Sequence, residues 1–366
     1  MILFNSFKKH TEKYKNQILK SIEKVFDSHW YVLGNEVNDF ESNYSSLTKV
    51  NHTIGVASGL DALIIALKAL DIMPEDEIIV PSNTYIASWL AVSAVNAKII
   101  PVEPDPRTFN INPLLIEEAI TDKTKVIMPV HLYGQPCDMV SIMEIANKYN
   151  LFVVEDNAQS QLATWNGKFT GSFGDINATS FYPTKNLGAI GEAGAITTNN
   201  EAYKNFVISY RNYGSREKYV NEIKGINSRI DELQAGILNV KLTYFEEFTE
   251  ERKIIAKRYY NNLKTLNEIE LPFVSNEAEH VYHLYVIKSN KRDELANFLL
   301  KNQIQTAIHY PIPPHLQLAY SELGYKKGDF PIAEKLSQTC LSLPLYPGLS
   351  MEEVDFICKK IKQFCK

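Results

Sequence analysis

The chain has 366 residues, of which 45% are hydrophobic and 22% charged, with a net charge of −5 and an isoelectric point near 6.0. A globular protein of this length is expected to form a large domain and a smaller one. The acidic balance disfavours nucleic acid as the main partner, and no apolar run is long enough to cross a bilayer.

The first residues turn polar after four positions, so no signal peptide is expected. The cysteines (Cys137, Cys340, Cys358 and Cys365) show neither disulfide-scaffold nor zinc spacing. We therefore expect a cytoplasmic protein with no membrane association and no metal site.

Short β-rich runs alternate with helical patterns through the first two-thirds of the chain. The predicted strands are Thr53–Ala57, Glu77–Pro81, Lys98–Val102, Lys125–Val130, Leu151–Glu155, Ala178–Phe181 and Ala193–Thr198. The predicted helices are Lys15–Phe26, Asp61–Leu70, Ile86–Val95, Leu114–Ile120 and Met139–Lys148. Because the strands are almost continuously apolar, an α/β fold is predicted, with a mostly parallel sheet covered by helices on both faces.

The pattern changes near Asp231, where a long amphipathic helix is predicted to begin and run to about Tyr260. The segments predicted after it are a strand at Val281–Lys288, a helix at Arg292–Asn302, a strand at Ile304–Ile308, a proline-rich loop at Tyr310–His315 and two final helices. We expect residues 1–239, including the N-terminal helix, to form the large domain, and residues 240–366 to form a small C-terminal α/β domain.

The segment Ala178–Gly194 contains one lysine, Lys185, among small, apolar and hydroxyl residues. In a glycine-rich turn after a strand, its amine could point into a cleft. Partial desolvation there lowers the pKa of a lysine and makes it a nucleophile toward a carbonyl. A solvated lysine on a surface loop is the alternative.

Asp156 stands at the carboxyl end of the apolar run Leu151–Val154. Held against a pyridine nitrogen, its carboxylate would keep that nitrogen protonated, so that the ring could accept electrons from a carbanion. Gln159, three residues on, could hydrogen-bond the phenolic oxygen of such a ring. A helix N-cap is the alternative for Asp156.

A phosphate cradle is predicted where a strand turns into a helix at Gly59, Leu60 and Asp61, whose backbone N–H groups would be free donors. Ser180 could add a hydroxyl, and Tyr85 could stack on the face of a cofactor ring. A purely structural turn and a core aromatic residue are the alternatives.

In their order and spacing, these motifs resemble the DegT/DnrJ/EryC1/StrS aminotransferases, which are pyridoxal 5′-phosphate (PLP) enzymes of fold type I that aminate nucleotide-linked keto sugars. The resemblance runs from about Phe4 to the C-terminus. It is carried by SGLDAL, PSNTYIAS, PVHLYGQP, VVEDNAQ, FYPTKNLGAIGEAGA, RNYGS and GINSRIDELQAGIL.

The resemblance implies that Lys185 binds PLP as a Schiff base and acts with Asp156 in catalysis. It places Gln159 on the ring, and Ser180 and the Gly59–Leu60 turn on the phosphate. It also implies a homodimer with composite sites, in which Asn227 reaches the phosphate of the partner subunit. Many family members have threonine at the position of Leu60, so one hydroxyl contact to phosphate is missing here.

The segment GLDAL and the loop Tyr310–Gln317 resemble the branch that acts on dTDP-linked 3-keto-6-deoxyhexoses. The implied reaction carries the amino group of L-glutamate, by way of pyridoxamine phosphate, to C3 of the sugar. A dTDP-3-amino-3,6-dideoxyhexose would result, for lipopolysaccharide O-antigen, another surface glycan or a natural product. The residues expected to contact the sugar nucleotide are Tyr182, Arg211, Lys218, Tyr219, Arg229, His309, Tyr310 and His315.

Several alternatives stay open. The two histidines could be only the polar rim of a loop. The protein could aminate C4 of a dTDP-4-keto sugar, or could be a non-catalytic regulator on the same scaffold. A PLP dehydratase of this family carries histidine in place of the Schiff-base lysine, so Lys185 argues against that activity. The configuration at C4 of the sugar, the nucleotide and the pathway are not determined by the sequence.

Overall fold

The computed structural model describes the backbone of residues 1–366 and every side chain except that of His10. The α-helices are α1 (Lys8–Ser28), α2 (Asn35–Thr48), α3 (Gly59–Ala69), α4 (Ile86–Ala94), α5 (Met139–Tyr149), α6 (Glu201–Tyr210), α7 (Glu232–Leu242), α8 (Phe245–Leu263), α9 (Arg292–Lys301), α10 (Pro331–Thr339) and α11 (Met351–Phe364). The strands are β1 (His52–Val56), β2 (Glu77–Pro81), β3 (Lys98–Val102), β4 (Thr124–Ile127), β5 (Phe152–Val153), β6 (Thr164–Trp165), β7 (Lys168–Phe169), β8 (Asn177–Ser180), β9 (Gly194–Thr198), β10 (Ser215–Glu217), β11 (Val220–Asn221), β12 (Ala278–Glu279), β13 (Tyr285–Lys288) and β14 (Cys340–Leu343). Short 3₁₀ turns cover Pro113–Leu115, Glu117–Ala119, Leu132–Gly134, Pro314–Leu316 and Leu318–Leu323.

The central sheet is built from two groups of strands. Strands β3, β2, β4 and β5 pair in that order and run parallel, while β9 pairs antiparallel with both β1 and β8. Parallel bridges from Asp156 to Val130 and to Ala178 join the two groups. Asp156 therefore lies where the sheet continues from one group to the other, and β9 is the strand that opposes the common direction.

Helices cover both faces of this sheet, as alternation along β2 shows. Ile78 and Val80 pack in a core with α3, α4 and α6, whereas Ile79 packs in a core with α5 on the opposite face. A third core joins α2 and α7 to β9 through Phe40, Phe181 and their neighbours. The carboxyl ends of the parallel strands thus open toward one edge, where ligands bind in such sheets.

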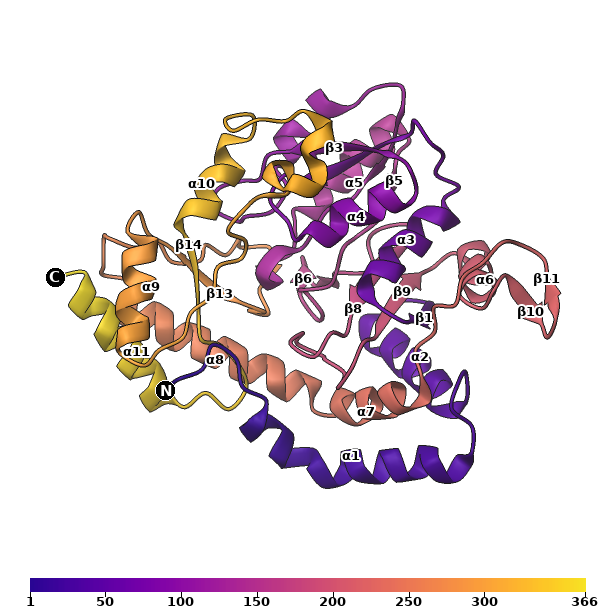
Figure 1. Cartoon of the computed structure of the whole chain (residues 1–366), viewed down its shortest axis with the longest axis horizontal. Coiled ribbons are helices and arrows are strands. Elements are labelled where there is room, and N and C mark those ends of the chain that lie inside the picture. Colours follow the sequence, from indigo (N-terminus) through magenta and orange to yellow (C-terminus); the bar gives the residue numbers. More distant parts are fainter.

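A separate hydrophobic core is formed by α8, α9, α11, β13 and β14. These elements lie together on the left in Figure 1, beside both chain termini, while the β10–β11 hairpin projects on the opposite side of the molecule.

The single long helix predicted from Asp231 to Tyr260 is wrong, because the chain forms α7 and α8 with a break at Thr243 and Tyr244. The Thr243 hydroxyl donates to the Val240 carbonyl, and the Tyr244 ring stacks on Tyr14 of α1 at 5.5 Å. Both helices contribute residues to the third core, and only the later part of α8, from Ile255 to Leu263, belongs to the separate core. The expected domain boundary between residues 239 and 240 falls inside α7.

Two further predicted elements are not formed. The segment Leu114–Ile120 makes two 3₁₀ turns instead of an α-helix, the first begun by Pro113 with an Asn112 cap. The segment Ile304–Ile308 makes isolated bridges at Ile304 and Ala307 instead of a strand, because each bridges a different segment. Helices α2 and α6 and the small hairpins were not predicted, since their sequences carry many polar residues and little periodic apolar pattern.

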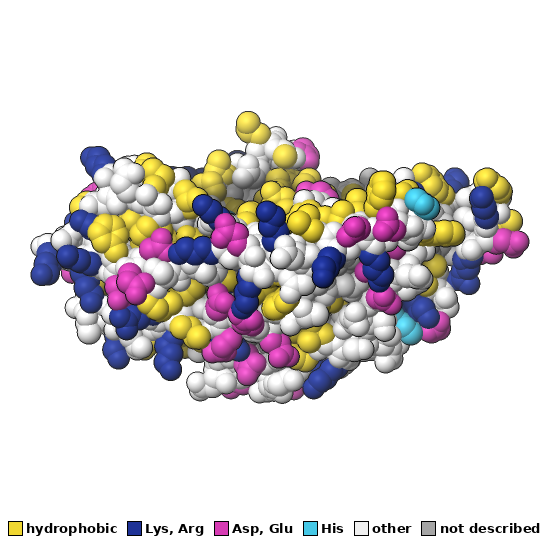
Figure 2. Space-filling view, turned by 90° about the horizontal axis from the view of Figure 1, so that it is seen from below, with side chains coloured by type: hydrophobic (Ala, Val, Ile, Leu, Met, Phe, Trp, Pro, Cys, Tyr) yellow, Lys and Arg dark blue, Asp and Glu magenta, His cyan; other side chains and the backbone are white. Residues whose placement is uncertain are grey.

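The surface is mixed in charge. On the face seen in Figure 2, basic and acidic side chains are interspersed. None of the described helices combines the length and the apolar character needed to span a bilayer.

Candidate active site

Lys185 lies in the loop that follows β8 and is largely shielded from solvent. Among the described residues, none forms a hydrogen bond or an ion pair with its amine. Burial lowers the pKa of Lys185 from 10.5 to about 8, and the nearby Asp156 carboxylate opposes that effect. About a tenth of this amine is therefore unprotonated at pH 7, far more than for an ordinary lysine, and the unprotonated amine is the nucleophilic form.

Asp156 is buried three residues after the end of β5, with 6% of its surface exposed. Its Oδ2 accepts a hydrogen bond from the Ser88 hydroxyl at 2.9 Å, and its Oδ1 accepts one from the Ala158 backbone N–H at 3.1 Å. No helix begins at this position, so the helix N-cap considered for Asp156 is not formed. The carboxylate is instead held at the sheet edge, on the same side as Lys185, with which it interacts electrostatically.

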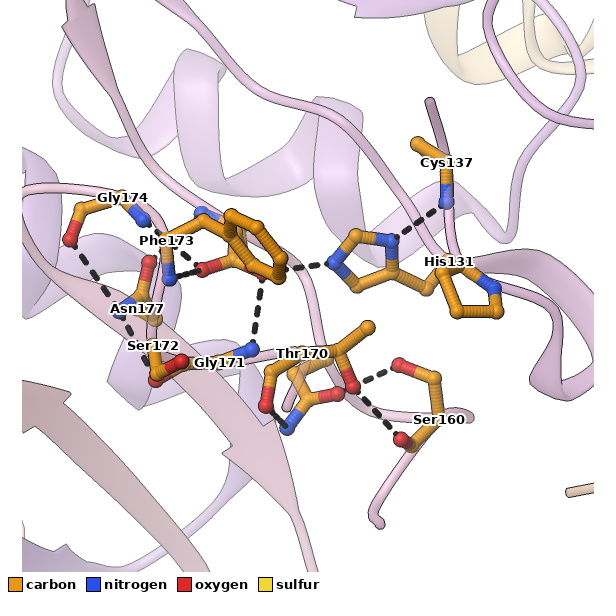
Figure 3. A network of polar contacts seen from close by, with 12 residues as sticks. His131, Cys137, Ser160, Thr170, Gly171, Ser172, Phe173, Gly174 and Asn177 are labelled. Carbon is orange, nitrogen blue, oxygen red and sulfur yellow. Dashed lines mark hydrogen bonds and ion pairs between the residues drawn. The ribbon is translucent and has the colours of Figure 1, made fainter. Parts of the chain in front are cut away.

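Glu155 is the centre of a buried network that fixes the backbone beside Asp156. Figure 3 shows its partners His131, Gly171, Phe173 and Gly174. The Glu155 carboxylate accepts the N–H groups of Gly171, Phe173 and Gly174 at 2.7–2.9 Å. It also pairs with His131 Nε2 at 2.9 Å, while His131 Nδ1 accepts the backbone N–H of Cys137. Because Nδ1 is an acceptor, the ring carries its proton on Nε2 and is neutral. These bonds tie the segment carrying Asp156 to two neighbouring loops.

Gln159 is positioned by two contacts. Its Oε1 accepts the Tyr133 backbone N–H at 2.7 Å, and its Nε2 donates to the Tyr310 hydroxyl at 3.1 Å. Tyr310 also packs against the Tyr85 ring, with centroids 5.3 Å apart. One hydrogen of the Gln159 amide remains available for a further acceptor. Tyr85 itself is 54% exposed, so its predicted alternative as a core aromatic is wrong.

The turn before α3 has the features of an anion site. Gly59 and Leu60 N–H groups have no partner among the described residues, whereas the Asp61 N–H donates to the Ser58 hydroxyl at 3.1 Å. Because the Asp61 N–H is already bonded to Ser58, it is not one of the free donors that we expected. The Asp61 carboxylate accepts a hydrogen bond from the Ser228 hydroxyl. Two of the three predicted N–H donors are therefore free.

Gly59 allows this turn to approach the strand that carries Ser180. A Cβ added at Gly59 would lie 2.5 Å from the Ser180 Cβ, closer than any real contact. The Ser180 hydroxyl consequently stands beside the free N–H groups of the helix terminus. An anion held there would interact favourably with the helix dipole.

These residues fit PLP. The cofactor needs an amine for its carbonyl, a carboxylate for its ring nitrogen, donors for its phosphate and an aromatic face. Lys185, Asp156, the Gly59–Leu60 turn with Ser180, and Tyr85 supply groups of those kinds. Among the described residues, no cluster of His, Cys, Asp and Glu side chains could hold a metal ion.

The loop that carries His309 and Tyr310 borders the same site. Burial, with Lys185 as a second cause, lowers the pKa of His309 to about 4, so this ring is neutral at pH 7. His309 Nδ1 lies 2.8 Å from the Ser342 hydroxyl, and the His309 carbonyl accepts from Tyr133. Tyr182, three residues before Lys185, is 46% exposed. The expected sugar contacts Tyr182, His309 and Tyr310 thus gather near Lys185.

Two predicted substrate contacts lie elsewhere. Arg211 is 6% exposed and bonds the Glu41 carboxylate and the Gly55 carbonyl, both at 2.6 Å, which makes it an internal support for β1. His315 is 2% exposed and pairs with Glu334 at 3.2 Å. The sequence could not reveal these carboxylate partners, and both side chains are buried against them.

The remaining predicted contacts lie on the side of the β10–β11 hairpin. Lys218 and Tyr219 form its tip, where Tyr219 is 86% exposed. Asn227 is exposed and accepts from Arg229 Nε at 2.9 Å, and Arg229 also covers the Tyr213 ring. Within one chain, none of the contacts among the described residues brings these side chains to Lys185.

Two residues at the site were missed by the sequence reasoning. Ser88 follows Tyr85 by three residues, the spacing that places both on neighbouring positions of one helical turn, and this signal could have identified it. Tyr133 connects Gln159 to the His309 loop, which only tertiary contacts reveal.

Comparisons with known proteins point to one family. The model of the DegT/DnrJ/EryC1/StrS aminotransferase family matches residues 12–362. The dTDP-3-amino-3,6-dideoxy-alpha-D-galactopyranose transaminase of Aneurinibacillus thermoaerophilus is 49% identical over 364 residues, covering 100% of this chain and 99% of the relative.

Solved structures show the same likeness. S. venezuelae DesV in complex with a ketimine intermediate has a TM-score of 0.98 and 40% identity, covering 100% of this chain and 98% of that one. The ntda protein of Bacillus subtilis with bound cofactor PMP has a TM-score of 0.90 and 35% identity. The match covers 96% of this chain and 82% of that one. The likeness implies the fold of type I PLP enzymes.

Proposed function

Because the chain belongs to the DegT/DnrJ/EryC1/StrS aminotransferase family, we propose that it is a PLP enzyme that transfers the amino group of L-glutamate to C3 of a dTDP-3-keto-6-deoxyhexose. One observation carries the proposal. A lysine with a pKa of about 8 stands beside Asp156, in a chain 49% identical over its whole length to a transaminase named for a dTDP-3-amino-3,6-dideoxygalactose. The product would be a dTDP-3-amino-3,6-dideoxyhexose for a glycan such as O-antigen or for a natural product.

When bound, PLP supplies a carbonyl for the incoming amine and a ring that accepts electrons. Lys185 would attack that carbonyl and, once displaced by the donor, move the proton at the α-carbon of glutamate. Asp156 would keep the ring nitrogen protonated. The free hydrogen of the Gln159 amide would hold the phenolic oxygen.

The phosphate would be held by the N–H groups of Gly59 and Leu60 and by the Ser180 hydroxyl. Leu60 has no hydroxyl to add, so the backbone donors carry this contact. Tyr85 would cover the ring from the α4 side, where its exposed aromatic face is available for stacking.

We propose a homodimer in which each subunit completes the site of the other. The hairpin tip with Lys218 and Tyr219 extends away from its own chain (Figure 1), and Asn227 is exposed beside Arg229. Exposed aromatic and cationic groups of this kind suit contacts to a phosphate or a nucleotide across an interface. Asn227 would reach the partner's phosphate site, and Lys218, Tyr219 and Arg229 the partner's sugar nucleotide.

On the sugar side, Tyr182, His309 and Tyr310 would bind hydroxyls next to the reacting carbon. The prolines at 311, 313 and 314 restrict the backbone after Tyr310, which reduces the entropy lost when the loop holds a ligand. We further propose that the reaction takes place in the cytoplasm. The division into two domains would lie at the α7–α8 break, close to the expected boundary at residue 240.

The proposal is tested by incubating purified protein with glutamate and a panel of dTDP-3-keto and dTDP-4-keto sugars. Amination at C3, measured by mass spectrometry and NMR of the product, is expected. Exclusive amination at C4 would refute the assignment to C3 of the sugar but would still support the transfer of an amino group from glutamate. No amination of any member, in protein that binds PLP, would contradict the substrate class and favour a binding or regulatory role.

A further inference from the structure

The start of α4 carries two buried hydroxyl groups next to Asp156. Ser88 is fully buried and Thr84 is 2% exposed. Ser88 Oγ donates to Asp156 Oδ2 at 2.9 Å and lies 3.0 Å from Thr84 Oγ1. The three side chains therefore form a short chain that ends on the carboxylate.

The direction of the hydrogen bonds follows from proton count. A hydroxyl has one proton to donate, and that of Ser88 is given to Asp156. Thr84 must then be the donor in its bond to Ser88. Bonds in such a series strengthen one another, because each donor is polarised by the bond that it accepts. Thr84 thus makes Ser88 a better donor to the carboxylate.

The same turn carries the aromatic face of the site. Tyr85 stands between Thr84 and Ser88 and is exposed toward Tyr310. The helix is fixed below this turn by Trp89, which is fully buried and donates from Nε1 to the Pro81 carbonyl at 3.1 Å. One rigid turn therefore places both the stacking residue and the support of the carboxylate.

We propose that Ser88, supported by Thr84, is a positioning residue that holds the Asp156 carboxylate in the orientation in which it pairs with the ring nitrogen. The inference rests on the proposed function, in which Asp156 pairs with the ring nitrogen of PLP. By holding Oδ2, Ser88 fixes the plane of the carboxylate. A hydrogen bond to the charged form also favours that form, so the shared proton stays on the ring nitrogen.

Other groups also act on this carboxylate. Lys185, Tyr310 and Cys137 interact electrostatically with Asp156, and the adjacent Glu155 is taken up by its own network. Among the described side chains, Ser88 is the one that donates a hydrogen bond to Asp156. Removing the Ser88 hydroxyl therefore changes one donor and leaves the charges in place.

The experiment is a pH titration of the visible absorbance of PLP-loaded protein. In Ser88→Ala, the ring nitrogen should be less fully protonated and withdraw less charge from the Lys185–PLP linkage. The pH at which that linkage loses its proton should rise, and the rate of the glutamate half-reaction should fall on the order of tenfold, the scale of losing one bond to a charged group. Thr84→Val should shift the midpoint less, in the same direction.

Matched variants separate positioning from structure. Ser88→Thr keeps the hydroxyl and should keep the wild-type midpoint. Ser93→Ala lies on the same helix, with its hydroxyl 3.1 Å from Tyr320, and should leave the titration unchanged. If Ser88→Ala does not fold, Thr84→Val decides the matter.

A midpoint in Ser88→Ala equal to that of the wild type would overturn the inference, even if the rate fell. If only Thr84→Val folds, a midpoint in that variant equal to that of the wild type would also overturn the inference. Absence of a visible band in the wild-type protein loaded with PLP would instead count against the proposed function. The two failures are therefore distinguishable.

Discussion

The Lys185 amine and the Asp156 carboxylate interact electrostatically without forming an ion pair. An ion pair would hold the lysine protonated and deprive it of nucleophilicity. At the separation found here, burial prevails over attraction, so the pKa of Lys185 falls to about 8 while Asp156 remains available to another partner. This relationship underlies the chemistry that we propose.

Borohydride reduction of PLP-loaded protein should attach the cofactor to Lys185. The reason is that Lys185 combines a lowered pKa with an amine unoccupied by any described partner. Peptide mass mapping measures the site of attachment. Lys241, whose pKa is also about 8, is the internal control, because its amine already donates to the Gly188 carbonyl. Labelling at Lys241 in place of Lys185 would overturn the assignment.

Lys185→Met should stabilise the protein without PLP at pH 7. The pKa of Lys185 is lower in the folded state than its ordinary 10.5, so the unfolded chain binds the proton more tightly. The cost of burying the charge is present in full below pH 8, declines between pH 8 and 10.5, and vanishes above. We expect a gain of about 1–3 kcal/mol in the free energy of unfolding at pH 7 that disappears by pH 10.5.

Urea titrations at several pH values measure this difference in the free energy of unfolding. Lys20→Met, at an exposed position of α1, is the matched control and should change stability little at any pH. A gain for Lys185→Met that grew with pH would contradict the buried position of the amine.

Asp156→Asn should lower the turnover number roughly thousandfold, the scale of removing a major electrostatic stabiliser. The asparagine oxygen can replace Oδ1 and accept from the Ala158 N–H, while its NH2 group can donate to the Ser88 hydroxyl, so the local turn is retained while the charge is lost. Steady-state kinetics and circular dichroism measure both effects. Near-normal turnover would show that Asp156 has only a structural role.

Mixing Asn227→Ala chains with Lys185→Ala chains should restore part of the activity lost in each. If Asn227 serves the partner's site, one of the two sites in a hybrid dimer carries neither change. Subunit exchange is verified with differently tagged chains, and activity is measured after mixing. A mixture that exchanges subunits but recovers nothing would place Asn227 in its own site, or in none.

His309→Asn should impair the reaction with the keto sugar and spare the glutamate half-reaction. His309 is neutral at pH 7 because its pKa is about 4, so it can bind hydroxyls but cannot serve as a cationic group for a carboxylate. The two half-reactions are followed separately by absorbance. Loss of the glutamate step with the sugar step intact would assign this loop to the amino donor.

Much of the fold could be predicted from apolar runs. The parallel strands from β2 to β5 are nearly continuous in apolar residues, and the helices α3, α4 and α5 show clear periodicity. The break between α7 and α8 could not be read in this way, since apolar residues on both sides of it pack in the same core and only the later part of α8 reaches the separate one. Periodicity records that a helix has a buried face, but not which core buries it.

The candidate site, like the fold, was predicted only in part from the sequence. Local order placed Lys185, Asp156, Gln159 and Ser180 as candidates, because polar groups that end apolar strands meet at the carboxyl edge of a parallel sheet. Only the tertiary structure showed that Arg211 and His315 are taken up by Glu41 and Glu334, and that Ser88 holds Asp156. A residue's type and position along the chain reveal what chemistry it can offer. Which partner satisfies it depends on contacts between segments far apart in sequence, and those arise only when the cores have packed.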